Sequence, residues 1–148
     1  MPPETRWFIK TSLACLLLAS ILGTLHFGWG ALFEGAPPHW LRNLHLHLGT
    51  VGWLVNLVLG VGLWMFPMPA GSFSRGIPRY SRGTVIACFV AINSGLVVRA
   101  IAEPLGSAAL GLACGVMQTA GIALGVASLW PRIRAISPPP GGVSPGTA

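Results

Sequence analysis

An all-α membrane protein with four transmembrane helices is the fold class that this sequence predicts. Of its 148 residues, 53% are hydrophobic and only 8% are charged, and the mean hydropathy is +0.70. A soluble domain carries about 25% charged residues, so this composition excludes a soluble globule. The apolar residues are gathered in long runs, and a membrane-spanning helix needs about 20 of them. Most basic residues stand in the short segments between these runs.

Four apolar runs qualify as spans, and they cover residues 7–32, 44–66, 84–102 and 107–130. The first run is too long for a signal peptide and is followed by further spans, so we expect it to remain as a helix. Together the runs define a transmembrane domain of residues 1–136. Residues 137–148 are rich in Pro and Gly and are expected to form a disordered tail.

The ends of the runs carry residues that are typical of helix starts and stops. Asn43 is a candidate N-cap for the second run, and Pro67 is expected to end it. Pro104 and Pro131 are expected to end the third and the fourth run. Glu103, just before the first of these two prolines, is then expected in a loop.

The basic residues predict the orientation of the chain. Nine Lys and Arg against three Asp and Glu give a net charge of +6, and cytoplasmic loops hold an excess of Lys and Arg. One side of the predicted topology carries Arg6, Lys10, Arg75, Arg79, Arg82, Arg132 and Arg134. The other side carries only Arg42. We therefore expect both termini in the cytoplasm, and a multi-pass protein of a bacterial-type inner membrane.

Small and polar residues inside the runs predict how the helices pack. Pairs of glycines four residues apart let membrane helices approach closely, and the fourth run has two such pairs, Gly111/Gly115 and Gly121/Gly125. We favour packing within the bundle over a contact between subunits. The amides at membrane depth are expected to form hydrogen bonds between helices; they are Asn56, Asn93 and Gln118.

Polar residues gather near the outer ends of the runs, where they are costly and usually functional. His26 lies near the end of the first run, His45 and His47 open the second, and Arg99 lies near the end of the third. His39 is in the preceding loop and is expected to be a surface residue. Histidines at a membrane boundary also occur as hydrogen-bonded interfacial residues, but such clustering favours a site.

The spacing of His45 and His47 predicts two different sites or neighbours. Residues two apart on a helix diverge by about 200°, so this pair cannot chelate one metal ion. The pair serves a site on each side of the helix, or one imidazole faces a site and the other faces lipid headgroups. A haem with histidine ligands uses neutral imidazoles in the axial positions, and a cation can pair with its propionates. The candidate haem-binding residues are therefore His26, His45, His47 and Arg99.

The stretch from His45-Leu-His47-Leu-Gly to Gly60-Val-Gly-Leu-Trp-Met-Phe-Pro67 resembles haem-copper oxidase subunit I, in the branch of C-type oxidases and nitric oxide reductases. That subunit has twelve spans in three arcs of four, and this chain has the spans of one arc. The resemblance implies that His45 and His47 are axial ligands on two different haems of b type. It also implies, more loosely, that Arg99 contacts a propionate.

The chain lacks several parts of that family. It has no adjacent His-His pair, and its one tyrosine, Tyr80, lies in the inner loop. The copper or non-haem iron site therefore does not carry over, and no other catalytic set is present, so we lean away from an enzyme. We keep copper as a second candidate metal, although no residues in the sequence favour a copper site.

We therefore expect a haem-binding membrane protein that acts in electron transfer or in redox or gas sensing. The alternative is a non-haem accessory or assembly subunit of a respiratory or copper-handling complex. A homotrimer with haems between subunits would use both diverging histidines. In a monomer or dimer, His26 would instead supply the second ligand. Lipid and a redox protein are the expected partners, and nucleic acid is not.

Overall fold

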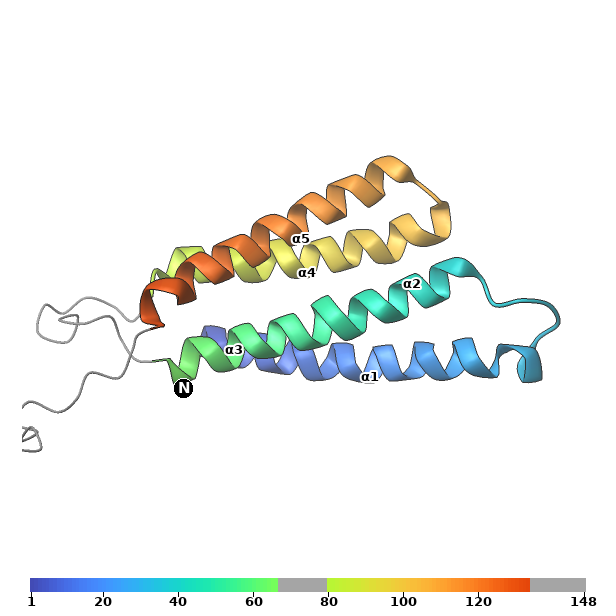
Figure 1. Ribbon diagram of the computed structural model, residues 1–148, viewed down its shortest axis with the longest axis horizontal. Helices are drawn as coiled ribbons and strands as arrows, with labels where there is room; N and C mark the ends of the chain where they lie inside the picture. Colours follow the sequence, from blue (N-terminus) through green and yellow to red (C-terminus); the bar gives the residue numbers. More distant parts are fainter. Residues whose placement is uncertain (67–79, 134–148) are drawn as a thin grey trace, which may run out of the picture.

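The computed structural model describes residues 1–66 and 80–133, and all regular structure in these two ranges is helical (Figure 1). Within them, four helical segments are long and apolar enough to cross a membrane, which confirms the predicted fold class. Pro67, Arg75, Arg79, Arg134 and the predicted tail lie outside the described residues.

The first segment is α1, Pro3–Leu32. The second is continuous and consists of α2 (His39–His47), a π-helix η1 (Leu48–Val55) and α3 (Asn56–Met65). The third is α4, Arg82–Leu105, and the fourth is α5, Ala108–Leu129, followed by a short 3-10 turn η2, Trp130–Arg132.

Two predicted helix ends are wrong. The second segment starts at His39 rather than after Asn43, because Pro38 has an extended backbone and takes the N-cap position. α4 continues through Pro104. The missing N–H of this proline removes one hydrogen bond, to the carbonyl of Ala100, but only Leu105 follows it in the helix, so little of the helix is affected. It ends instead at Gly106, whose φ of +61° is a left-handed conformation that glycine adopts without strain.

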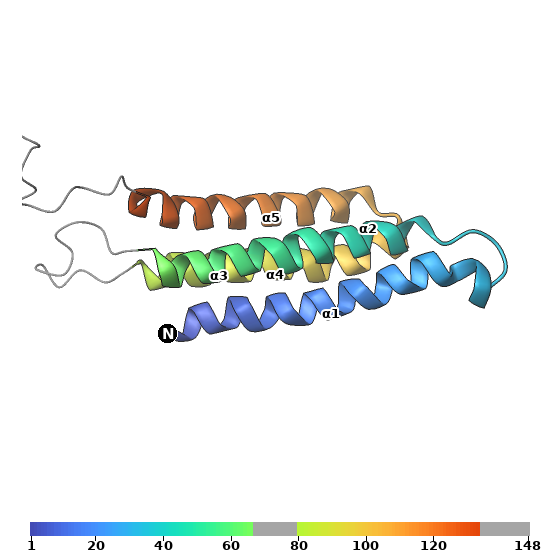
Figure 2. The same ribbon diagram turned by 60° about the horizontal axis from the view of Figure 1, so that its bottom comes forward.

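The helices form an open row rather than a closed ring. α1 packs along the second segment, and α4 packs along α5 (Figure 1). In Figure 2, α1 and α5 lie on opposite sides, with the second segment and α4 between them. Both views show the same order of helices. The two outer helices, α1 and α5, each keep one face without a neighbouring helix.

The helices converge at the end that holds the N-terminus, here called the terminal end. Phe8 of α1 packs edge-on against Phe89 of α4, with ring centroids 5.1 Å apart. The buried core there contains Phe8, Leu59, Leu63, Val85, Cys88, Ile92 and Leu129. Buried Glu4 pairs with Arg82 and accepts a hydrogen bond from Tyr80. The opposite end, with the loop of residues 33–38 and the turn at Gly106, is called the hairpin end.

The two glycine pairs of α5 have different surroundings. A Cβ atom on Gly121 would lie 2.6 Å from Cγ1 of Ile92, and one on Gly125 would lie 2.7 Å from Cδ2 of Leu59. These two glycines permit close packing of α5 on α4 and α3, as the sequence predicted. Gly111 and Gly115 have nothing within 4 Å, so their face of α5 is open.

The π-helix η1 is a feature that the sequence did not predict. The Nδ2 of Asn56 donates to the carbonyl oxygens of Val51 and Gly52, 3.2 and 3.0 Å away. The same amide exchanges hydrogen bonds with the amide of Asn93 in α4. These bonds satisfy two carbonyls inside η1. π-turns inside α-helices often mark functional segments. Two of the predicted interhelical amides are confirmed, while Nε2 of Gln118 has no partner among the described residues.

Candidate functional site

His45 is directed at α1. Its Nδ1 lies 2.8 Å from the carbonyl oxygen of Ala19, and its ring packs where Gly23 has no side chain. A Cβ on Gly23 would lie 2.8 Å from Cε1 of His45. A carbonyl can only accept, so in the neutral imidazole Nδ1 carries the proton and Nε2 keeps a lone pair.

His47 has the same hydrogen-bonding arrangement within its own helix. Its Nδ1 lies 2.9 Å from the carbonyl oxygen of Asn43, one turn earlier. The neutral ring is therefore also protonated on Nδ1, with the Nε2 lone pair available. Metal-binding histidines commonly donate one ring N–H to a carbonyl while the other nitrogen binds the metal.

The other two histidines lie apart from this arrangement. His26 is on α1, about one turn beyond Gly23, and packs edge-on against Phe27 with ring centroids 5.5 Å apart. Its Nδ1 is buried and has no hydrogen-bond partner among the described residues. His39 is the exposed first residue of α2 rather than part of the loop.

Arg99 forms an ion pair that was not expected from the sequence. Its Nη1 lies 2.9 Å from Oε1 of Glu103, and these side chains are only 14% and 18% exposed. Asn43 of α2 donates to the other oxygen of Glu103 at 3.1 Å. The expectation that Glu103 lies in a loop is wrong, because α4 extends beyond Pro104. The spacing of four residues between Arg and Glu was the available signal.

His47 contacts the backbone carbonyl of Asn43, and the side chain of Asn43 contacts the ion pair of Arg99 and Glu103. His45 lies on the side of α2 that faces α1, which is also the helix of His26. Arg99 keeps its Nε buried without a partner in the described part of the chain. Within residues 1–66 and 80–133, no group of three His, Cys, Asp or Glu could hold a metal ion, and the cysteines there are buried and free.

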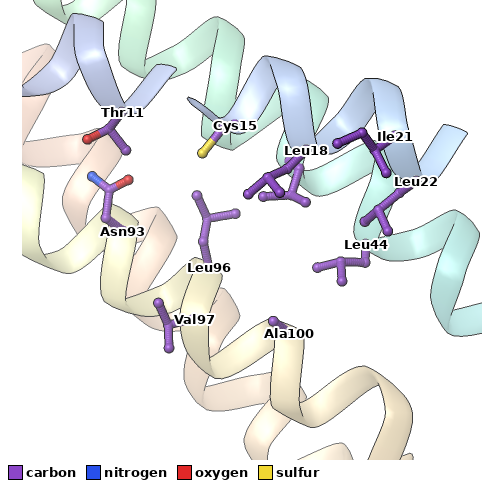
Figure 3. A pocket seen from close by; sticks show the side chains of 11 residues that line it. Thr11, Cys15, Leu18, Ile21, Leu22, Leu44, Asn93, Leu96, Val97 and Ala100 are labelled. Carbon is purple, nitrogen blue, oxygen red and sulfur yellow. The ribbon is translucent and has the colours of Figure 1, made fainter. Parts of the chain in front are cut away.

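An apolar groove lies between α1 and α4, with the second segment also contributing to its lining (Figure 3). Its volume is about 460 Å³, and it is lined by Thr11, Cys15, Leu18, Ile21, Leu22, Leu44, Leu48, Asn93, Leu96, Val97 and Ala100. At one end Thr11 and Asn93 face each other across it, and they are its polar lining residues. No histidine is among the lining residues, so the groove and the candidate haem ligands are separate features.

Comparisons with protein-family models, curated proteins and solved structures give no match to this chain. The likeness to haem-copper oxidase subunit I therefore stays a prediction that rests on the residues of the second segment.

Proposed function

We propose that this chain is a haem-binding membrane protein of b type, related to one arc of haem-copper oxidase subunit I. It acts in electron transfer or in redox or gas sensing. The observation that carries the proposal is the shared state of His45 and His47. Each donates Nδ1–H to a backbone carbonyl, and each keeps an Nε2 lone pair at the hairpin end of the second segment.

The donor set fits haem in its chemistry. Neutral imidazole nitrogens are the axial ligands of b-type haems, and bound haem supplies one-electron oxidation and reduction. A carbonyl acceptor on the second nitrogen fixes the ring orientation and increases the basicity of the ligand. Arg99 has guanidinium N–H donors besides the Nη1 that pairs with Glu103, and a propionate carboxylate can accept from them.

The proposed assembly is a homotrimer in a bacterial inner membrane, with both termini in the cytoplasm. The open row of helices supports a ring, because each copy would be completed by its neighbour rather than by its own helices. His45 and His47, which differ in their surroundings, then serve haems on two sides of the helix. In the alternative monomer or dimer, His26 and His45 share the α1 side and one haem.

The test is the absorbance spectrum of membranes that contain the expressed chain. Reduction with dithionite is expected to shift the Soret band and produce an α-band. His45→Ala and His47→Ala each remove or convert this signal, while the exposed control His39→Ala leaves it unchanged. Full haem content with unchanged spectra in both ligand variants would falsify the ligand assignment. A colourless wild-type chain would favour the accessory-subunit alternative.

A further inference from the structure

Two cations on the outer face of α1 stand without a counter-ion. Arg6 and Lys10 are both exposed, and neither has an ion-pair partner among the described residues. They are four residues apart, so they are neighbours on the helix surface, where like charges repel. The acidic residues of a second copy are not available either, since Glu4 and Glu103 pair with arginines and Glu34 lies at the hairpin end. An anion from outside the chain would relieve this repulsion.

The cations lie within the depth that apolar side chains cover on the next helix. A Cβ on Gly60 of α3 would lie 2.9 Å from the Cβ of Phe8, so these two residues are level. Met65, which is 67% exposed, is five residues nearer the terminal end. At 1.5 Å per residue, the backbone of Lys10 is therefore about 10 Å deeper than that of Met65. An ionised side chain at such depth is costly, and it is usually found with a partner.

The direction of α1 brings the charge of Lys10 back toward the lipid headgroups. Side chains of an α-helix tilt toward its N-terminus, and the N-terminus of α1 is at the terminal end (Figure 2). Lysine stems lie along apolar surface while the ammonium group reaches toward the polar boundary. The ammonium of Lys10 is thus directed toward the level of Arg6. A membrane lipid can place a phosphate group there.

The α1–α4 groove of Figure 3 begins beside Lys10, because the next residue, Thr11, is part of its lining. Residues eleven apart on a helix differ by only about 20° in direction. Lys10 therefore stands in line with Ile21, and Trp7 in line with Leu18, which both line the groove. Leu18 is 50% exposed, so the groove opens to the outside of the bundle. A ligand that fits both features has an anionic group for the cations and a hydrocarbon chain for the groove.

We infer that α1 binds one anionic phospholipid at the terminal end, with the phosphate between Arg6 and Lys10 and an acyl chain in the α1–α4 groove. The indole N–H of exposed Trp7 is a further donor for the headgroup. The lipid is anionic rather than zwitterionic, because a choline or ethanolamine group would bring a third cation to the site. The proposed haem ligands lie at the hairpin end, so lipid binding and haem binding can each fail alone.

A lipid titration followed by native mass spectrometry in detergent tests the site. Phosphatidylglycerol and phosphatidylcholine with identical acyl chains are the probes, and the wild type is expected to bind the first more tightly. Lys10→Gln should weaken phosphatidylglycerol binding about fivefold, the contribution of one cation near an anionic surface. Lys10→Arg should retain the affinity. The matched control is Arg42→Gln, which removes an exposed cation of α2 and is expected to change nothing.

Two results of this titration would overturn the inference. One is equal affinity of the wild type for the two lipids. The other is an unchanged affinity for phosphatidylglycerol in Lys10→Gln.

A second experiment separates a bound lipid from a free anion and from a protein partner. Val97→Trp fills the groove from an exposed position of α4 and is expected to weaken phosphatidylglycerol binding, while Val126→Trp, exposed on α5, is the control. Inorganic phosphate should not displace the lipid. Displacement by phosphate, or full binding in Val97→Trp, would reduce the site to a surface anion site. A polypeptide that stays with the delipidated wild type but not with Lys10→Gln would show an acidic partner helix in place of the lipid.

Discussion

Asn56 and Asn93 exchange two side-chain hydrogen bonds between α3 and α4, with Nδ2 to Oδ1 distances of 3.3 and 3.2 Å. The pair joins the two halves of the helix row near the middle of α4. Asn56 is fully buried and also donates to two carbonyls of η1, so one side chain links the π-helix to its neighbouring helix.

Replacing one member of this pair is expected to destabilise the bundle. Asn93→Leu removes the interhelical bonds and lowers the free energy of unfolding by about 1 kcal/mol, as for other membrane side-chain bonds. Asn56→Leu also leaves carbonyls of η1 without their donor and costs about 2 kcal/mol. Because the partners interact, the double variant loses less than the sum. Equilibrium unfolding in bicelles measures the free energy of unfolding of each variant, with Ser94→Ala as a control. Strict additivity would show that the pair is not coupled.

Gly23 is expected to be required for the position of His45. An alanine Cβ there would lie 2.8 Å from the imidazole, so Gly23→Ala displaces the ring from the carbonyl of Ala19. Overpacking of this kind costs about 1 to 3 kcal/mol. We expect reduced stability and the same spectral change as in His45→Ala. Gly30→Ala is the matched control, since nothing lies within 4 Å of its Cβ. Identical behaviour of the two alanine variants would contradict the prediction.

Arg132 is expected to hold the end of α3. Its Nη2 lies 3.2 Å from the carbonyl oxygen of Leu63 and also donates to that of Phe66. The last carbonyls of a helix lack partners within it, and a cation there is favourable. Arg132→Met is therefore expected to lower stability by about 2 kcal/mol, the range of bonds to charged groups. Thermal unfolding in detergent measures the loss, and Arg132→Lys should recover part of it. Arg6→Met, at an exposed position, is the control.

The ion pair of Arg99 and Glu103 predicts a rescue. Arg99→Leu leaves a mostly buried carboxylate with only Asn43 as a partner, and is expected to cost about 2 kcal/mol. Removing both charges in Arg99→Leu/Glu103→Leu should restore most of that stability. Haem retention should stay low in the double variant, because the propionate would still lack its cation. If haem retention recovers together with stability, Arg99 has only a structural role.

The orientation predicted from the basic residues can be tested by labelling. Ser74→Cys, outside the described residues, is expected to react with a membrane-impermeant maleimide only after the cells are opened. Ala36→Cys, in the opposite loop, should react in intact cells. Both variants are made in a background with Cys15→Ala, Cys88→Ala and Cys114→Ala, so that only the introduced cysteine reacts. Labelling of Ser74→Cys in intact cells would reverse the assignment.

The all-α fold class and the number of membrane-spanning helices could be predicted, because the lengths of the apolar runs and the positions of the prolines between them determine both. Helix ends were less predictable, as Pro104 shows: a proline breaks an interior turn but is tolerated near a C-terminus that Gly106 completes. The π-helix had no signal in the apolar pattern. It depends on hydrogen bonds from Asn56, whose partner Asn93 is distant in sequence.

For the site, the sequence could indicate which residues are unusual at membrane depth but not what they bind. The Nδ1 partners of His45 and His47 are backbone carbonyls, one of them on another helix, and no spacing rule predicts such partners. Glu103 was misplaced because its role depends on where α4 ends. The groove arises only when α1 and α4 diverge from the terminal end, which is a property of the packed helices.

The π-helix makes the angular position of the histidines tolerant of one particular change in chain length. η1 stands between His47 and Asn56, and a π-turn holds one more residue than an α-turn. Deleting exposed Thr50 removes this extra residue, and α-helical winding of the shorter stretch keeps α2 and α3 near their present relative orientation. Deleting Val58 inside α3 removes a residue where no extra one exists, and rotates the preceding part of the segment by about 100° relative to the rest of α3. The haem spectrum is therefore expected to survive the first deletion and to be lost in the second.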